Sequence, residues 1–147
     1  MRHLLFVCTG NTCRSPMAEA FCKKIIRENH LEREISASSA GLAAYEGGPE
    51  SPNAIAVMRE AGEDISAHRA TLLTPQSAAQ ADEIWVLSPS HKQAIVSALP
   101  HLAERVFVLG NGISDPYGQG IEVYRACRDE IERAVRQIPC LKERSQP

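Results

Sequence analysis

The chain has 147 residues, of which 44% are hydrophobic and 23% charged, and its formal net charge at pH 7 is −2. This length fits one domain with a substantial core, and the composition is that of a globular protein rather than a disordered one. The small net charge excludes a protein that binds nucleic acid or a membrane surface through bulk basicity. The first apolar stretch is too short to span a bilayer or to form a signal-peptide core, so we expect a cytoplasmic protein.

Four short apolar runs are typical of β-strands, and helical patterns separate them. The runs occupy residues 3–7, 35–38, 83–87 and 106–109. Strands that alternate with helices indicate successive β-α units and a parallel sheet. With right-handed crossovers, they predict a single doubly wound α/β sandwich over residues 1–147, in which helices flank a four-stranded parallel sheet of order 2-1-3-4.

Four of the expected helices begin at a hydroxyl residue followed by proline, a pair that suits the N-cap and the first helical position. These pairs are Ser15-Pro16, Ser51-Pro52, Thr74-Pro75 and Ser88-Pro89. Gly62 is a suitable stop for the second helix. In the last helix, apolar residues recur at helical spacing and predict a face that covers the sheet. They are Ile121, Tyr124, Cys127, Ile131, Val135 and Ile138.

The cysteines have neither the spacing of a disulfide framework nor that of a zinc site. They are Cys8, Cys13, Cys22, Cys127 and Cys140. An odd number without a C-x-x-C pair is typical of free thiols in a reducing compartment. No matching histidine pair accompanies them, so we expect no metal.

The segment VCTGNTCRSP concentrates two thiols, a glycine and an arginine between an expected strand and an expected helix. It leaves the first strand at the carboxyl end, where ligands bind in doubly wound folds. The amides of residues 9–14 and the helix N-terminus form an anion site, and the Arg14 guanidinium suits two oxygens of a phosphate. The same groups favour the thiolate of Cys8, which predicts a nucleophile aimed at a bound tetrahedral oxyanion.

A proton donor for the leaving group is expected in the segment after the fourth strand, which emerges at the same end of the sheet as Cys8. Asp115 lies there, followed by Pro116, which stiffens the backbone, and by Tyr117, whose ring can flank a substrate. We predict that Cys8 attacks phosphorus while Asp115 protonates the leaving group. Asp115 then activates the water that hydrolyses the phosphocysteine. Because the loop already supplies positive charge to the bound phosphate, we expect that the reaction needs no metal or other cofactor.

These motifs resemble the low-molecular-weight protein tyrosine phosphatase family. Residues 8–15 are similar to the signature loop of that family, and Asp115-Pro116-Tyr117 is similar to its general-acid motif. Comparable stretches occur at Ser39-Ala40-Gly41, at Ile65 to His68 and at residues 81–87, so the resemblance covers nearly the whole chain. It implies phosphorylated proteins as substrates and a phosphate-binding loop. That loop would consist of Thr9, Gly10, Asn11, Thr12, Cys13, Arg14 and Ser15.

The resemblance also implies roles for the other polar residues of the loop. Asn11 and Ser15 would support its shape, and the Ser15 hydroxyl would help to hold Cys8 as a thiolate. Cys13 would form a reversible disulfide with Cys8 on oxidation. Read without the resemblance, Cys13 could equally pack beneath the loop.

Thr12 is the residue on which the predicted substrate depends. Tyrosine-specific members usually carry a bulky aliphatic residue there, whereas threonine resembles the bacterial protein-arginine phosphatase branch, as does DPYGQG at residues 115–120. A hydroxyl can accept a guanidinium N–H that an aliphatic wall would leave unpaired. Gly118 leaves the rim open, although Tyr117 would also stack on phosphotyrosine. We therefore predict a protein-arginine phosphatase, with a protein-tyrosine phosphatase as the alternative.

Three other functions share only part of this pattern. An arsenate reductase would require further cysteines around residues 80–90, and residues 81–92 contain none. A phosphocysteine carrier would need Cys8 but has little use for Asp115 or Arg14. A phosphoprotein-binding module would need no thiol at all.

The remaining conspicuous side chains have structural interpretations. We expect His68 and His91 to be structural and Trp85 to pack in the core or near the site. The arginines of the last helix are expected to form a solvated face. They are Arg125, Arg128, Arg133 and Arg136. A monomer is assumed, without nucleic-acid or membrane partners.

Overall fold

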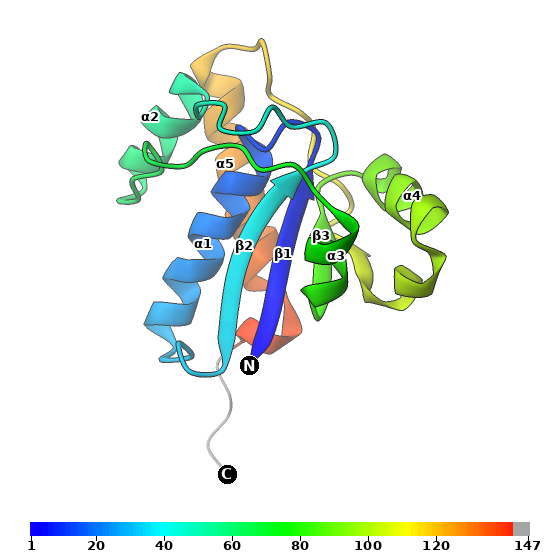
Figure 1. Ribbon diagram of the computed structural model, residues 1–147. Helices are drawn as coiled ribbons and strands as arrows, with labels where there is room; N and C mark the ends of the chain where they lie inside the picture. The colour runs from blue at the N-terminus through cyan, green and yellow to red at the C-terminus, as the bar shows by residue number, and fades with distance from the viewer. Residues whose placement is uncertain (143–147) are drawn as a thin grey trace.

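The computed structural model describes residues 1–142, and a sheet of four parallel strands lies at its centre (Figure 1). The strands are β1 (Arg2–Cys8), β2 (Ile35–Gly41), β3 (Glu83–Val86) and β4 (Val106–Val108). Their order in the sheet is β2-β1-β3-β4, which confirms the predicted topology. Because all pairs are parallel, the carboxyl ends of the strands meet at one end of the sheet.

The second strand is longer than the sequence pattern predicts. It ends at Gly41 rather than Ser38, because Ala40 and Gly41 pair in register with Val7 and Cys8 of β1. Small residues carry little strand propensity of their own, so the neighbouring strand decides their conformation. The extension places Gly41 directly beside Cys8.

One face of the sheet is covered by α1 (Arg14–Glu28) and α5 (Ile121–Arg136), which pack against each other (Figure 1). Helix α2 (Pro52–Glu60) packs beside α5. Leu4 and Phe6 of β1 point into the core on this side. This is the larger of two cores, since alternate residues of a strand face opposite sides of the sheet.

The opposite face carries α3 (Pro75–Gln80), α4 (Pro89–Ala98) and the 3₁₀ turn η1 (Pro100–Arg105). Leu5 and Val7 of β1 point into the smaller core beneath these elements. Strand β1 is therefore buried on both faces, which explains its continuous apolar run.

The last helix buries the predicted face. Its buried side chains are Tyr124, Cys127, Ile131 and Val135. Ile121 is only partly buried, and Ile138 is buried but lies beyond the helix, before the 3₁₀ turn η2 (Pro139–Leu141). Among residues 1–142, no helix is long and apolar enough to cross a bilayer.

The arginines of α5 are more than a solvated face. Arg125 and Arg128 both form ion pairs with Glu60 of α2, at 2.9 and 2.8 Å. Arg128 also donates a hydrogen bond to the carbonyl oxygen of Val57 at 3.0 Å. These contacts attach α2 to α5, so Arg125 and Arg128 also hold two helices together, a role that the sequence did not reveal.

The first helix begins earlier than predicted. Its N-cap is Cys13 and its first residue is Arg14, so Ser15 lies inside the first turn rather than at the cap. The Ser15 hydroxyl is 2.9 Å from Cys8 Sγ and accepts a hydrogen bond from Asn11 Nδ2 at 2.8 Å. Contacts with the preceding loop therefore replace the expected cap.

The other three helix starts were predicted correctly, but their hydroxyls differ in whether they form a hydrogen bond that caps the helix. Thr74 caps α3 through a reciprocal capping box with Ser77. Ser51 and Ser88 occupy the N-cap positions of α2 and α4 without a side-chain cap bond. Helix α2 ends at Glu60, followed by the predicted stop at Gly62, whose φ is +83°.

Candidate active site

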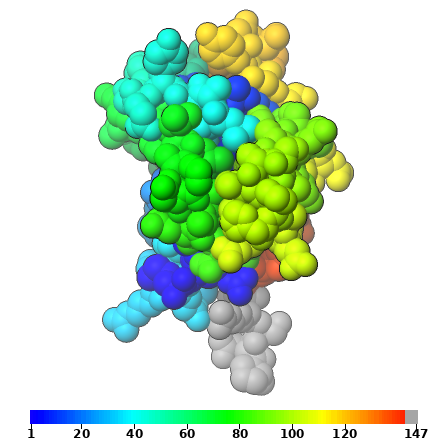
Figure 2. Space-filling model, turned by 45° about the vertical axis from the view of Figure 1, so that its right-hand side comes forward, coloured from blue at the N-terminus to red at the C-terminus, as the bar shows by residue number. Residues whose placement is uncertain are grey.

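The loop between β1 and α1 lies at the carboxyl end of the sheet, at the top of Figure 1. The chain that follows β2 supports it through three backbone hydrogen bonds. The N–H of Leu42 donates to the carbonyl oxygen of Cys8 at 3.0 Å, and the N–H of Ala43 to that of Thr9 at 2.9 Å. The N–H of Ser51 donates to the carbonyl oxygen of Thr12 at 3.0 Å. In Figure 2 the chain after β2 (cyan) and the segment before α5 (yellow-orange) gather at this end of the molecule, around the N-terminal loop (blue).

Gly41 permits the close approach of the loop to β2. A Cβ atom at this position would lie 2.6 Å from the carbonyl oxygen of Thr9 and 2.9 Å from the amide nitrogen of Asn11. Both distances are shorter than ordinary van der Waals contacts, so a side chain here would displace the loop. Gly41 lies in the stretch Ser39-Ala40-Gly41, which resembles a stretch of the family. The short distances at this position explain why a glycine stands there.

The loop and the segment before α5 enclose one cavity of about 210 Å³. Its lining residues are Cys8, Thr9, Gly10, Thr12, Cys13, Arg14, Asp115 and Tyr117. The fold thus brings together the predicted nucleophile, oxyanion-binding arginine and proton donor, which are far apart in the sequence. Asn11 and Ser15, the other two predicted loop residues, are fully buried and do not line the cavity.

The thiol of Cys8 lies at the end of β1 and is 2% exposed. Its sulfur is 2.9 Å from Ser15 Oγ and accepts the backbone N–H of Asn11 at 3.3 Å. Both neighbours can donate to a thiolate, which has no proton of its own. The contact with Ser15 is the one that the family resemblance implied.

Asn11 holds the loop in shape. Its φ of 55° lies in the left-handed region, which asparagine tolerates better than most residues. Its Nδ2 donates to Ser15 Oγ at 2.8 Å and to Ser39 Oγ at 3.0 Å, and its Oδ1 accepts the N–H of Thr71 at 2.9 Å. These partners come from α1, β2 and the chain before α3, so three segments fix one loop residue.

The guanidinium of Arg14 is buried and only partly satisfied. Its Nη1 donates to Ser88 Oγ and to the carbonyl oxygen of Ile113, both at 2.8 Å. Its Nη2 lies 3.7 Å from Asp115 Oδ2, and its buried Nε has no hydrogen-bond partner among residues 1–142. The edge formed by Nε and Nη2 is therefore available to two oxygens of an anion in the cavity.

Asp115 and Tyr117, from the segment before α5, line the cavity together with residues of the loop. The Asp115 carboxylate is about half exposed, and its Oδ1 accepts the N–H of Tyr117 at 3.0 Å. The Tyr117 side chain is 74% exposed, so its ring lies open to solvent beside the cavity. A substrate that enters the cavity meets the carboxyl group of Asp115 and the aromatic ring of Tyr117.

Cys13, Cys22 and Cys127, three buried thiols of the larger core, are neutral. Burial raises the pKa of Cys13 to about 12, and the nearby Cys8 and Asp115 add to this effect. Burial likewise raises the pKa values of Cys22 and Cys127 to about 12. All five cysteines are free. Cys13 packs at the end of the loop as a thiol, and its role in a disulfide with Cys8 stays a prediction.

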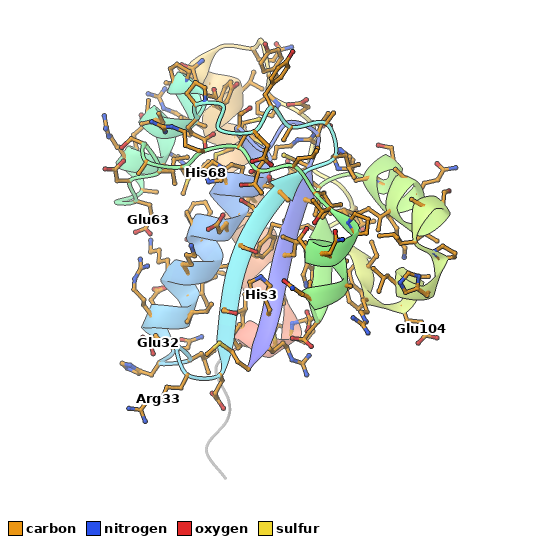
Figure 3. The ribbon with its side chains drawn as sticks, in the orientation of Figure 1. His3, Glu32, Arg33, Glu63, His68 and Glu104 are labelled. Atoms are coloured by element: carbon orange, nitrogen blue, oxygen red, sulfur yellow. The ribbon has the colours of Figure 1, made fainter. Side chains whose placement is uncertain are left out.

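Two histidines contact residues of the loop, a role that the sequence did not reveal. His68 Nε2 lies 3.1 Å from the carbonyl oxygen of Asn11 and 3.2 Å from its Oδ1, and Figure 3 shows His68 beside the first turn of α1. His91 Nε2 lies 2.9 Å from Thr9 Oγ1. The structural interpretation of both residues agrees with these contacts. Their place at the loop has no sequence signal, because each is distant from its partner along the chain.

Glu50 is a further residue that the sequence did not single out. Its carboxyl group is fully buried, and Oε1 accepts the N–H of Ser51 at 3.2 Å. Its Oε2 lies 4.0 Å from His68 Nε2 and has no hydrogen-bond partner within the described part of the chain. Burial raises the pKa of Glu50 to about 9, so this carboxyl group is protonated at neutral pH.

Trp85 lies away from the cavity. It is partly buried against the larger core, and its ring stacks on Phe107 with a centroid distance of 4.9 Å. Its indole N–H donates to Glu83 Oε1 at 2.8 Å. Of the two interpretations that the sequence allowed, packing in the core is the one that the structure supports.

The chain is similar to known proteins of one family. Residues 3–145 match the sequence model of the family described as low molecular weight phosphotyrosine protein phosphatase. The chain therefore belongs to that family, and it is a phosphatase whose substrates are phosphorylated proteins.

Individual relatives carry different names, which include protein-arginine-phosphatase, low molecular weight protein-tyrosine-phosphatase and arsenate reductase. A "Protein-arginine-phosphatase" of Geobacillus stearothermophilus is 39% identical over 139 residues, which is 90% of each chain. A "Probable low molecular weight protein-tyrosine-phosphatase EpsP" of Ralstonia nicotianae is 37% identical, over 92% of each chain. The crystal structure of a YwlE mutant from Bacillus subtilis superimposes with a TM-score of 0.88 at 34% identity, covering 94% of this chain and 96% of the other.

Proposed function

We propose that the protein is a protein-arginine phosphatase that acts through a phosphocysteine intermediate on Cys8. The observation that supports phosphoarginine as the substrate is the position of Thr12, which lines the cavity together with Cys8 and Arg14. A hydroxyl in the cavity wall can accept an N–H of the guanidinium leaving group, which a wall of methyl groups would leave unpaired. The name of the Geobacillus relative supports the same branch.

In the first step, the Cys8 thiolate attacks phosphorus and the bond from phosphorus to the guanidinium nitrogen breaks. The loop amides and the free edge of Arg14 hold the non-bridging oxygens, which carry the charge of the transition state. Protonated Asp115 gives its proton to the departing nitrogen, so that neutral or cationic arginine leaves rather than an anion. The products of this step are phosphocysteine and the unmodified arginine side chain.

In the second step, water hydrolyses the phosphocysteine. Asp115 is now a carboxylate beside the cavity, and it accepts a proton from the attacking water. The bond from phosphorus to sulfur breaks, and the thiolate is stabilised by the N–H of Asn11 and the hydroxyl of Ser15. Inorganic phosphate leaves, and both Cys8 and Asp115 return to their starting states.

One observation favours the alternative, a protein-tyrosine phosphatase. The exposed ring of Tyr117 lies at the cavity, where it can stack on the phenol ring of phosphotyrosine. The name of the Ralstonia relative supports this alternative.

The two functions are separated by a direct comparison of substrates. Peptides of one sequence that carry phosphoarginine, phosphotyrosine or phosphoserine are assayed with the same preparation of the protein. We expect the highest kcat/KM for phosphoarginine and no turnover of any peptide by Cys8→Ser. A higher kcat/KM for phosphotyrosine would replace the proposed function by the alternative.

A further inference from the structure

His91 links helix α4 to the first residue of the phosphate-binding loop. Its Nε2 lies 2.9 Å from Thr9 Oγ1, and the histidine is only 5% exposed. Its Nδ1 is buried without a hydrogen-bond partner among residues 1–142. The ring therefore has one polar contact, and that contact is with a residue of the cavity wall.

The unpaired Nδ1 decides which nitrogen of the ring carries the proton. A neutral imidazole has one N–H and one lone pair, and a buried N–H without an acceptor is the less favourable group to leave unpaired. The proton thus belongs on Nε2, which donates to Thr9 Oγ1. Burial and the nearby guanidinium of Arg14 lower the pKa of His91, against a smaller opposing effect of Asp115, so the ring is neutral at pH 7.

This direction of the hydrogen bond leaves the Thr9 hydroxyl proton free. A hydroxyl has one proton and two lone pairs, and His91 occupies one lone pair. Thr9 is exposed and lines the cavity. Its O–H can therefore donate to an oxygen atom of a ligand bound there.

We propose that His91 is a positioning residue that aims the Thr9 hydroxyl at the phosphoryl group during transfer. Thr9 directly follows Cys8, and both residues line the same cavity, so we assign the Thr9 hydroxyl to the transferred group rather than to the rest of the substrate. The role therefore does not depend on the leaving group. It rests on the phosphatase reaction proposed above, but not on the choice between phosphoarginine and phosphotyrosine.

The test is a double-mutant cycle in kcat/KM with p-nitrophenyl phosphate, repeated with a phosphoarginine peptide. The variants are His91→Phe, which removes the donor, Thr9→Val, which removes the hydroxyl at nearly constant shape, and the two combined. A hydrogen bond to a charged group justifies an expected loss of about tenfold for each single variant. The double variant is expected to lose no more than either single one, because His91 acts through Thr9. The losses are expected to be equal for both substrates.

Two further variants separate positioning from a merely structural role. His91→Gln places an amide N–H where Nε2 was, and we expect it to recover most of the activity. His101→Phe changes an exposed histidine of η1 and serves as the matched control, with wild-type kcat/KM. Wild-type activity of Thr9→Val, losses that multiply in the double variant, or a His91→Gln variant as impaired as His91→Phe would each overturn the inference. A preference of the wild type for phosphotyrosine would instead overturn only the proposed substrate.

Discussion

Three buried side-chain nitrogen or oxygen atoms lack a hydrogen-bond partner within residues 1–142, and all three lie in or around one loop. They are Arg14 Nε, Glu50 Oε2 and His91 Nδ1. A buried polar group without a partner costs free energy, so such groups are uncommon in folded proteins. Arg14 faces the cavity, His91 contacts Thr9, and Glu50 lies beside the histidine that holds Asn11. Their concentration here distinguishes the surroundings of the loop from the rest of the described interior.

The substrate preference is expected to depend on Thr12. Thr12→Ile replaces a hydroxyl by methyl groups, so the guanidinium of phosphoarginine loses an acceptor while the ring of phosphotyrosine gains apolar contact. Such a loss is worth about 1–3 kcal/mol, which lowers kcat/KM for phosphoarginine about tenfold to a hundredfold. The measurement is the ratio of the kcat/KM values for the two substrates. An unchanged ratio in the variant would remove Thr12 from the determinants of specificity.

The side chain of Asp115 is expected to act as general acid. Asp115→Asn cannot supply a proton, and we expect kcat to fall by about 10²–10⁴-fold, the usual contribution of positioned proton transfer. The loss should be smallest for aryl phosphates whose leaving group departs without a proton. Steady-state kinetics over a series of leaving groups measures this dependence. If every leaving group suffers equally, Asp115 has a structural role, for example through its bond to the N–H of Tyr117.

The buried Glu50 is expected to make stability fall as the pH rises. Its pKa is about 9 in the folded protein against an ordinary value of 4.5, so between these values the folded state holds a proton that the unfolded chain has lost. The destabilisation is absent below about pH 4.5, grows through neutral pH and is complete above about pH 9. Glu50→Gln removes the ionisable group and keeps its shape.

Thermal unfolding at a series of pH values tests this linkage. The midpoint of Glu50→Gln should exceed that of the wild type by an amount that increases from acid to alkaline pH. Glu104→Gln, at an exposed position of η1, provides the matched control without such a trend. A constant difference between Glu50→Gln and wild type over the whole series would show that Glu50 is ionised when buried.

At the scale of elements, the helix starts show what local patterns can and cannot predict. The hydroxyl-proline pairs marked the right positions for α2, α3 and α4. The pattern failed at Ser15, because the hydroxyl there contacts Cys8 and Asn11 instead of capping α1. The requirements of the loop, which depend on the tertiary structure, outweighed the local preference.

The position of the loop relative to β2 is expected to depend on Gly41. Gly41→Ala places a Cβ within 2.6 Å of the Thr9 carbonyl oxygen, so the loop must shift. Because small displacements of catalytic groups can cost about a hundredfold in rate, we expect a loss of kcat/KM of that order. Weaker inhibition by inorganic phosphate should accompany it.

Gly120→Ala is the matched control for this prediction, since a Cβ at Gly120 meets no atom of residues 1–142 within 4 Å and its φ of −75° suits alanine. We expect it to retain wild-type kinetics. Normal phosphate inhibition of Gly41→Ala would show that the loop accommodates a side chain at this position.

At the scale of the whole molecule, the sheet order and the shared location of Cys8, Arg14 and Asp115 followed from the sequence, because parallel strands deliver their loops to one end of the sheet. The residues that surround and support the loop could not be predicted from the sequence. His91 and Glu50 have ordinary sequence surroundings, and only the packing of distant segments brings them to the loop. Contacts between distant segments leave no pattern in the local sequence. A strand that is followed by a loop and a helix start does leave such a pattern.

In the proposed mechanism, Cys8 carries the phosphoryl group between substrate and water. Rapid denaturation during turnover of a phosphoarginine peptide, followed by mass mapping of the protein, shows whether this intermediate forms. Asp115→Asn is included with p-nitrophenyl phosphate, whose leaving group departs without a proton. With this substrate the variant should slow hydrolysis of the intermediate more than its formation, and so increase its amount. We expect a single phosphoryl group on Cys8, removed when substrate is exhausted. A phosphoryl group on another residue, or turnover in which none ever appears on Cys8, would contradict the mechanism.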